Sequence, residues 1–213
     1  MGDPSTDLLG ERSGSKRLNA ADRRRQLLGV AKKLFARHGY KMTTTASIAK
    51  AASVTEPILY RHFRSKKSLF LEVINEIRRE TLDEWRKMAG EHDDPLEVLY
   101  MIARSFQTAM QTHGLEYRVA HRALAEVVDR DIAAMLRSFY GDEADFFTDI
   151  IRQGQRSGRF RSDIDARVAA WSIIRQALAY SLTEPLGISL YQEPDHYDRM
   201  VKTTFSTLLL PED

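Results

Sequence analysis

Basic and hydroxyl side chains crowd a short segment in the first third of the chain. Residues 53–70 read SVTEPILYRHFRSKKSLF and contain Arg61, His62, Arg64, Lys66 and Lys67. Lys and Arg bind duplex DNA by neutralising phosphates, which carry about one charge per 1.7 Å of helix axis, and by releasing their counterions. Hydroxyl groups donate hydrogen bonds to phosphate oxygens as well. These residue types therefore support binding to an anionic polymer or surface.

The charge of the chain is unevenly distributed. The 213 residues have a formal net charge of +2. Residues 1–70 hold 15 Lys and Arg and 5 Asp and Glu, a net charge of +10, whereas residues 71–213 hold 17 and 25, a net charge of −8. Such asymmetry indicates a nucleic-acid or anionic-surface module joined to a part with another task. A chance cluster of solvated basic residues is the alternative.

Composition excludes several classes of protein. The chain has no cysteine, so disulfides, thiolate zinc sites and a cysteine nucleophile are excluded. Charged residues make up 29% of the chain, and no uncharged apolar run approaches the ~18 residues that span a bilayer. The N-terminal residues contain acidic side chains and no long apolar run, which argues against a secretory signal. We therefore expect a cytoplasmic protein with no membrane partner.

Neither an enzyme site nor a metal or cofactor site is expected. The six histidines form no H-E-x-x-H or H-x-x-E-H pattern. Asp142, Asp145 and Asp149 share one helical face, but without a partnering histidine a solvated acidic face is the better interpretation. Gly154 and Gly158 lack the strand and the Lys-Ser/Thr pair of a phosphate-binding loop.

Three helices are predicted before residue 66. Residues 22–38 place apolar side chains at helical spacing, and Gly39 is suited to end that helix in a left-handed conformation. The threonines of MTTTASIAKAA are candidate N-caps for a short second helix. Thr55 can cap a third, whose first turn contains Pro57 and whose buried face carries Leu59 and Phe63. Two short helices joined by a tight turn make a helix-turn-helix, whose second helix can enter the major groove.

The segment TTTASIAKAASVTEPILYRHFRSKKSLF resembles the DNA-binding signature of the tetracycline-repressor (TetR) family. The resemblance covers residues 24–73, a third of the chain, and many positions agree in register. Two positions depart from the family pattern. Ser53 replaces the usual turn glycine, and Glu56 stands where Lys or Arg is frequent and so removes one attraction for phosphate.

The remaining chain predicts long helices and no strands. Apolar residues recur at helical spacing over 68–88, from Asp94-Pro95 to Met110, through Ala120, Leu124 and Val127, over 135–150, over 165–184 and over 195–210. The fold class is all-α. We expect a disordered tail over 1–18, a three-helix helix-turn-helix domain over 19–66, and a helical-bundle domain for ligand binding and dimerisation over 67–213.

The resemblance and the side-chain chemistry together imply a set of DNA contacts. By resemblance, Thr44, Tyr60, His62 and Lys66 contact the phosphate backbone. Glu56 could accept from a cytosine amino group, Pro57 and Ile58 could touch a thymine methyl, and Arg61 could reach guanine or a phosphate. The full set of expected DNA-binding residues is Thr44, Thr45, Ala46, Thr55, Glu56, Pro57, Ile58, Tyr60, Arg61, His62 and Lys66.

The resemblance also implies a homodimer and a small-molecule effector. In the family, the last two long helices form a four-helix bundle with those of a second subunit, and the middle helices enclose an apolar pocket. An alternative is that both apolar stripes are satisfied within one subunit and that the aromatic residues are only core. The candidate ligand-binding residues are Phe106, Gln107, Met110, His113, His121, Phe139, Phe147, Trp171 and Gln176.

The expected function is sequence-specific transcriptional regulation. The resemblance implies a repressor that binds a palindromic operator in double-stranded DNA as a dimer and is released by a small apolar ligand. A helical adaptor protein that binds DNA without sequence preference, or binds an anionic membrane surface, is the alternative. Sequence preference on duplex DNA separates the two, since a generic polyanion binder depends on salt without preferring a sequence.

Overall fold

All regular structure in the described part of the chain is helical. The computed structural model describes residues 19–112, 114–183, 186 and 195–208. The helices follow in the order α1 (Ala20–Met42), α2 (Thr45–Ala51), α3 (Glu56–His62), α4 (Lys66–Glu91), α5 (Pro95–Gln111), α6 (Leu115–Ala123), the short 3-10 helix η1 (Leu124–Glu126), α7 (Arg130–Arg156), α8 (Ala166–Thr183) and α9 (His196–Ser206). The all-α expectation is confirmed. The expected tail over 1–18 lies outside the described residues.

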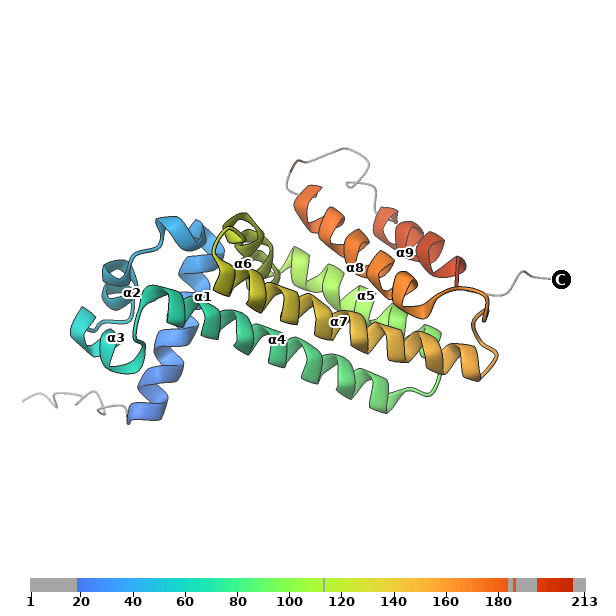
Figure 1. Ribbon diagram of the computed structural model, residues 1–213, viewed down its shortest axis with the longest axis horizontal. Helices are drawn as coiled ribbons and strands as arrows, with labels where there is room; N and C mark the ends of the chain where they lie inside the picture. The colour runs from blue at the N-terminus through green and yellow to red at the C-terminus, as the bar shows by residue number, and fades with distance from the viewer. Residues whose placement is uncertain (1–18, 113, 184–185, 187–194, 209–213) are drawn as a thin grey trace, which may run out of the picture.

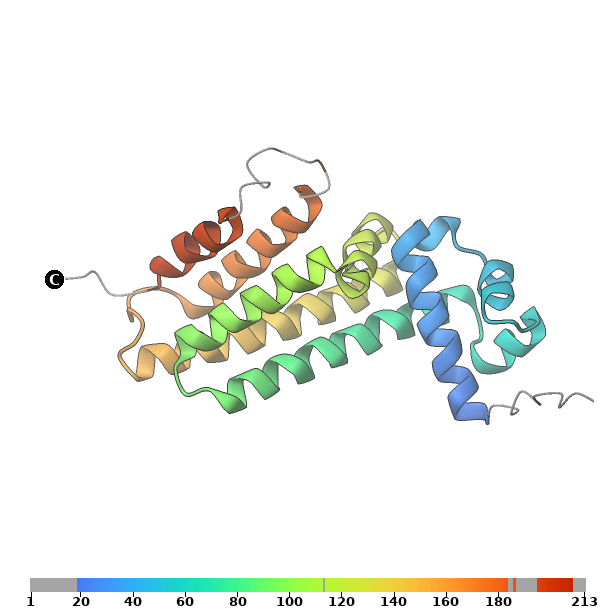
Figure 2. The same ribbon diagram turned by 180° about the vertical axis from the view of Figure 1, so that it is seen from behind.

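The helices form an elongated molecule with the small helices at one end. Helices α1, α2 and α3 lie together at the end that carries the N-terminus, and α4 leaves this group to run along the molecule (Figure 1). Seen from behind, α4, α5 and α7 extend side by side along the long axis (Figure 2). Helices α8 and α9 lie beside α5 and α7 at the other end. Helix α4 thus runs from the N-terminal group into the C-terminal part, and α6 also packs against α1.

Polar side chains cap several helices, as the sequence indicated at Asp94. Thr55, the expected cap of α3, stands at the N-cap position but makes no side-chain cap hydrogen bond. The Asp94 side chain accepts from the Leu96 N–H, and Asp129 accepts from the N–H groups of Asp131 and Ile132. Ser65 accepts from the Ser68 N–H at the start of α4. Each bond satisfies a backbone donor that the first helical turn leaves without an intrahelical partner.

The first helix is interrupted where the sequence predicted its end. Gly39 has φ 75° and ψ 172°, inside the range assigned to α1. A residue with a Cβ adopts this conformation only with strain. The chain therefore changes direction at Gly39 before it enters α2.

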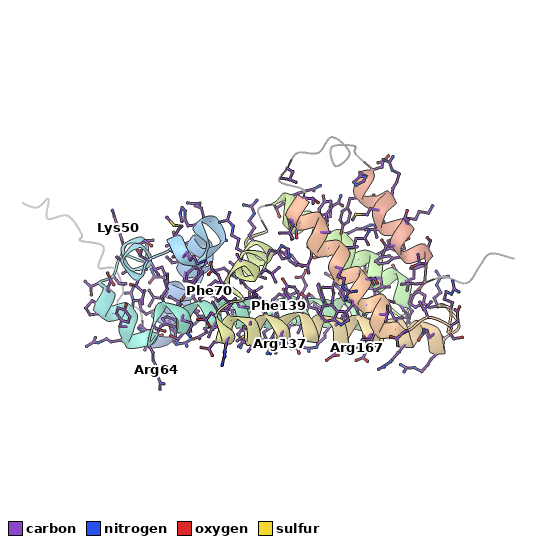
Figure 3. The ribbon with its side chains drawn as sticks, turned by 45° about the horizontal axis from the view of Figure 1, so that its top comes forward. Lys50, Arg64, Phe70, Arg137, Phe139 and Arg167 are labelled. Carbon is purple, nitrogen blue, oxygen red and sulfur yellow. The ribbon has the colours of Figure 1, made fainter. Side chains whose placement is uncertain are left out.

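An aromatic cluster joins α1 to α4 within the core. The ring of Phe35 packs edge-on against Phe70 with centroids 4.8 Å apart, and Tyr40 lies 4.7 Å from Phe70. Phe35 and Phe70 are fully buried. Phe70 and Phe139 point into the interior, whereas Arg137 points outward from α7 (Figure 3). The helix-turn-helix is thereby fixed to the helix that connects it with the rest of the chain.

One apolar residue departs from the buried face expected of it. Val127 was expected on an apolar helical face with Ala120 and Leu124, yet its side chain is 47% exposed. Helix α6 ends at Ala123, and a single 3-10 turn follows before the Asp129 cap starts α7. Val127 is therefore in a connection rather than on a packed helix.

Candidate DNA-binding surface and effector cavity

Helices α2 and α3 are joined by a turn in which a serine adopts a glycine-like conformation. Thr44 caps α2 by accepting from the Ser47 N–H at 3.0 Å, and the Ser47 hydroxyl accepts in return from the Thr44 N–H. Ser53 has φ 55°, the left-handed region that the family's usual glycine enters without strain. The Val54 N–H donates to the Ala49 carbonyl and closes the turn. The departure at Ser53 leaves the helix-turn-helix intact.

Buried apolar residues fix the orientation of these two helices. Ile48 and Ala49 of α2, Leu59 of α3 and the following Phe63 are buried against the core that includes Leu27 of α1. Because one face of each short helix is buried, the opposite face is presented to solvent. The outer face of α3 is therefore available to a partner.

The expected DNA-binding residues lie on or beside this outer face. Six of them are exposed: Thr44, Ala46, Thr55, Pro57, Tyr60 and Arg61. Five are half-buried: Thr45, Glu56, Ile58, His62 and Lys66. Lys50 and Arg64 project from the same end of the molecule (Figure 3). Between residues 43 and 67 the single acidic side chain is Glu56, so the surface is strongly basic.

Hydrogen bonds connect three of these residues across the two helices. The Thr45 hydroxyl of α2 donates to a Glu56 carboxylate oxygen of α3 at 2.9 Å. The Tyr60 hydroxyl donates to the Thr45 oxygen at 3.4 Å, which is a long contact. Glu56 is therefore held in place by α2, and its charge is partly satisfied before any DNA arrives.

Lys66 has a structural partner in addition to the phosphate role expected of it. Its ammonium group donates to the Tyr40 carbonyl oxygen at 3.0 Å and lies 4.3 Å from the centroid of the Tyr40 ring. Burial raises the pKa of Tyr40, so its ring remains neutral. The contact holds the Lys66 side chain beside Tyr40. Lys66 is the first residue of α4, where the free N–H groups of the helix also favour an anion.

A cavity lies between the helices of the C-terminal part. Residues from α4 to α9 line it, most of them apolar or aromatic, and its volume is about 70 Å³. Small-molecule sites are typically apolar pockets of ~300–1,000 Å³ with a few placed polar groups. The lining fits that description, but a drug-sized molecule would have to widen the space.

The structure brings five of the nine expected ligand-binding residues to this cavity. They are Phe106, His121, Phe139, Phe147 and Gln176. Gln107, Met110 and Trp171 do not line it. Met110 is buried elsewhere in the core, and Trp171 lies partly exposed with Arg175 over its ring. His113 lies outside the described residues.

Three polar groups in the cavity have unusual environments. Glu143 of α7 is 6% exposed, and burial raises the pKa of its carboxyl to about 8. The buried Tyr140 hydroxyl has no hydrogen-bond partner among the described residues, and burial together with the Glu143 charge raises its pKa. Burial lowers the pKa of His121 to about 4, so its ring is neutral near pH 7, with Ser181 Oγ 3.5 Å from Nε2.

Glu143 and Tyr140 were not among the expected ligand-binding residues, although the sequence contains a signal for Glu143. Phe139 and Phe147 lie four residues before and after Glu143, so the carboxyl is on their face of the helix. A charged residue in the middle of an apolar face is rarely buried without a partner. That position is the one that periodicity alone could have singled out.

The family of the chain follows from its helix-turn-helix. Residues 27–73 match the family model described as "Bacterial regulatory proteins, tetR family", the span that contains α2, the Ser53 turn and α3. The family model, the curated relatives and the solved structures all indicate the TetR family of regulators. Like the TetR-family proteins it matches, the chain is a DNA-binding transcriptional regulator.

Individual TetR-family relatives support the same assignment over different lengths. The chain is 26% identical over 160 residues to the transcriptional repressor KstR2 of Rhodococcus jostii, covering 72% of this chain and 78% of the relative. It is 42% identical over 62 residues to the regulator QacR of Staphylococcus aureus, covering 29% of this chain and 33% of QacR. The shorter match has the higher identity but covers less than a third of this chain.

Solved TetR-family structures share the whole fold. A TetR-family regulator from Agrobacterium tumefaciens superposes with a TM-score of 0.80 over 90% of this chain and 100% of the other, at 17% identity. Identity this low supports the fold alone. It confirms the combination of an N-terminal helix-turn-helix domain with a C-terminal helical domain.

Two acidic residues of α7 form surface ion pairs with arginines of neighbouring helices. Asp142 pairs with Arg78 at 2.9 Å, and Asp145 pairs with Arg167 at 2.5 Å. Across the described residues, no group of three or more His, Cys, Asp or Glu is arranged to hold a metal ion. Within the same residues, no helix is both long and apolar enough to cross a bilayer.

Proposed function

We propose that this TetR-family protein is a repressor that binds a palindromic DNA site as a homodimer and is released when a small, largely apolar molecule enters the cavity. The observation that supports this most directly is that one chain contains both a basic helix-turn-helix surface and an aromatic cavity, connected by continuous helices. The names of the KstR2 relatives, which are repressors, agree with it.

Two helices link the cavity to the DNA-binding surface. Trp85 of α4 lines the cavity, and the same helix begins at Lys66, four residues after α3. Tyr117 and His121 of α6 also line it. A ligand that displaces either helix would therefore move α3.

Helix α6 also bonds to the C-terminal end of α1. Arg122 of α6 donates to the Arg37 carbonyl of α1 at 2.7 Å, and Lys41 pairs with Glu126 at 3.4 Å. Lys67 of α4 pairs with both Asp129 and Asp131 at the start of α7. A hundredfold release requires about 2.7 kcal/mol of coupling between ligand and DNA binding, which a single buried ligand can supply.

Selection of bound sequences from a random duplex pool at near-physiological salt tests the DNA-binding part of the proposal. Enrichment of a short palindrome is the expected result, since two-fold symmetry in the protein requires it in the site. Recovery of unenriched DNA would contradict the repressor function and favour a non-specific binder. The selected site then serves to screen molecules that release the protein.

Replacing Arg61 by alanine is expected to weaken DNA binding about tenfold to a hundredfold. Arg61 is exposed on α3 and makes no hydrogen bond or ion pair with the described residues, so the melting temperature should not change. Titration at several salt concentrations identifies the contact, because a lost phosphate contact lowers the salt slope by about one. Arg137→Ala, which removes an exposed arginine of α7, is the control, and equal behaviour of the two variants would eliminate Arg61 as a contact.

Replacing Glu56 by alanine is expected to relax sequence preference at one base pair. The carboxylate that Thr45 holds in place can accept from a cytosine amino group, which alanine cannot do. Repeating the selection with this variant measures the effect. An unchanged site profile would leave Glu56 with only its structural contact to Thr45.

A further inference from the structure

The cavity contains a carboxyl group that the folded chain does not compensate. Glu143 is 6% exposed, and no hydrogen bond or ion pair reaches it from the described residues. Burying an ionised carboxylate without a partner is strongly unfavourable, and such groups are normally paired or neutralised. When such an acid lines a cavity, a bound ligand can supply the missing counter-charge or hydrogen bond.

Aromatic side chains line the cavity together with this carboxyl group. Phe139, Tyr140 and Phe147 lie on the same face of α7 as Glu143. Trp85 of α4 contacts Phe147 with ring centroids 4.9 Å apart, and Phe139 meets Tyr140 edge-on at 5.1 Å. Ring faces carry negative electrostatic potential and attract cations, especially in a desolvated site.

Among the described residues, no positively charged side chain lines the cavity. The ionisable lining residues are Tyr117 and His121 from α6, Tyr140 and Glu143 from α7, and Tyr197 from α9. The residues that α4, α5 and α8 contribute include none, and His121 is neutral near pH 7. An anionic ligand would find no positively charged side chain among these lining residues, whereas a cation would find an ionisable carboxyl group and a set of aromatic rings.

We infer that the cavity binds a lipophilic cation, of the aryl or alkyl ammonium class, whose charge is compensated by Glu143. This inference rests on the proposed function in identifying the bound molecule as the effector. The apolar part of the ligand replaces contacts within the aromatic lining, and its cationic centre ionises Glu143. The Tyr140 hydroxyl, which has no partner, can then donate to the carboxylate.

Binding of a permanently charged ligand should release a proton. In the empty cavity Glu143 has a pKa of about 8 and is protonated near pH 7. The bound cation stabilises the ionised form, so its affinity rises with pH until about pH 8 and is constant above it. Between pH 6 and pH 7 the dissociation constant should fall by nearly tenfold, because each unit shifts the ionised fraction by about that factor.

Two probes of equal shape isolate the contribution of charge. Phenyltrimethylammonium is a permanent cation, and tert-butylbenzene is its neutral isostere. Both exceed the 70 Å³ now free, so both require the same widening of the cavity. Calorimetry in buffers of different ionisation enthalpy measures affinity and protons released, and quenching of Trp85, which lines the cavity, gives an independent affinity.

At pH 8 the cation should bind the wild-type protein at least about tenfold more tightly than its isostere, and at pH 7 with release of close to one proton. Glu143→Gln should weaken the cation by about tenfold or more, abolish proton release and leave the isostere within about twofold. Asp149→Asn, which removes an exposed acid of the same helix, is the matched control and should change none of these.

Three results would overturn the inference. They are equal affinity of the two probes, cation binding to wild-type protein without proton release, and failure of the cation to bind at millimolar concentration. The wild-type measurements decide the question even if Glu143→Gln does not fold.

Release of the selected DNA site separates this inference from the proposed function. If the cation binds with proton release but does not release DNA, the ligand class is supported and the regulatory function is rejected. If neutral compounds release DNA independently of Glu143, the regulatory function is supported and the cation inference is rejected.

Discussion

Val168→Asp is expected to convert the proposed homodimer to a monomer and to lower its affinity for a palindromic site by about a hundredfold or more. Val168 is 62% exposed on α8. It begins a row of exposed residues at alternating spacings of four and three, which continues through Ser172, Arg175, Ala179 and Leu182. This is the spacing of a helix seam that packs against another helix. An aspartate buried in such a seam would be unpaired, while in a monomer it would be solvated.

The matched control is the same change at another exposed valine. Val128 is 94% exposed in the connection before α7, far along the chain from α8. Val128→Asp should remain dimeric and keep its DNA affinity. Light scattering after gel filtration gives the oligomeric state, and titration of the selected site gives the affinity. A Val168→Asp variant that stays dimeric would place the dimer interface away from this row.

Glu143→Gln is expected to abolish a loss of stability that the wild-type protein shows as pH rises from 6.5 to 8. The folded-state pKa of Glu143 is about 8 and its ordinary value is 4.5. Between these values the folded protein keeps a proton that the unfolded chain releases, so the free energy of unfolding falls with pH by about 1.4 kcal/mol per unit. Over 1.5 units the loss is roughly 2 kcal/mol.

His121 acts in the opposite direction but in a lower window. Its pKa of about 4 in the folded protein lies below the ordinary 6.5, so the unfolded chain binds the extra proton and stability rises with pH between these values. Above about pH 7.5 that contribution is nearly constant, and between pH 6.5 and pH 8 the larger Glu143 effect sets the direction of the change.

Denaturant unfolding of wild type, Glu143→Gln and His121→Gln at pH 6.5, 7.25 and 8 measures the effect. His121→Gln should retain the decline seen in the wild type. Parallel curves for wild type and Glu143→Gln would show that the carboxyl is not the group that titrates.

The helix-turn-helix could be predicted from the sequence because its determinants are local. Thr44 caps α2, Pro57 lies in the first turn of α3, and Leu59 and Phe63 are buried four residues apart, as their spacing required. Ser53 shows that register outweighs turn preference, since a serine accepts φ 55° when the buried residues on both sides are in place. What spacing could not give is the bond between Thr45 and Glu56, which depends on the angle between two helices.

The cavity was predicted less completely, because its lining depends on how long helices are rotated against one another. Phe106 and Phe139 line it, as expected, but Gln107 and Trp171 do not. Helical periodicity alone could not show which of these residues face the cavity. Glu143 was overlooked for a different reason. Its neighbours in the sequence include the acidic residues of the solvated face of α7. Only its spacing of four residues from Phe139 and from Phe147 shows that Glu143 lies on the apolar face of that helix.

The small volume of the resting cavity sets the concentration at which the protein would respond. A molecule larger than the resting space of about 70 Å³ binds only to a widened conformation of the protein. The apparent dissociation constant equals the intrinsic one divided by the population of that state, so a conformer present at about 1% turns nanomolar contacts into a threshold near 0.1 µM. Such a regulator does not respond to ligand concentrations well below this threshold and releases DNA only when the ligand has accumulated above it. Substitutions that enlarge the empty cavity would lower the apparent dissociation constant for the ligand without adding a contact to it.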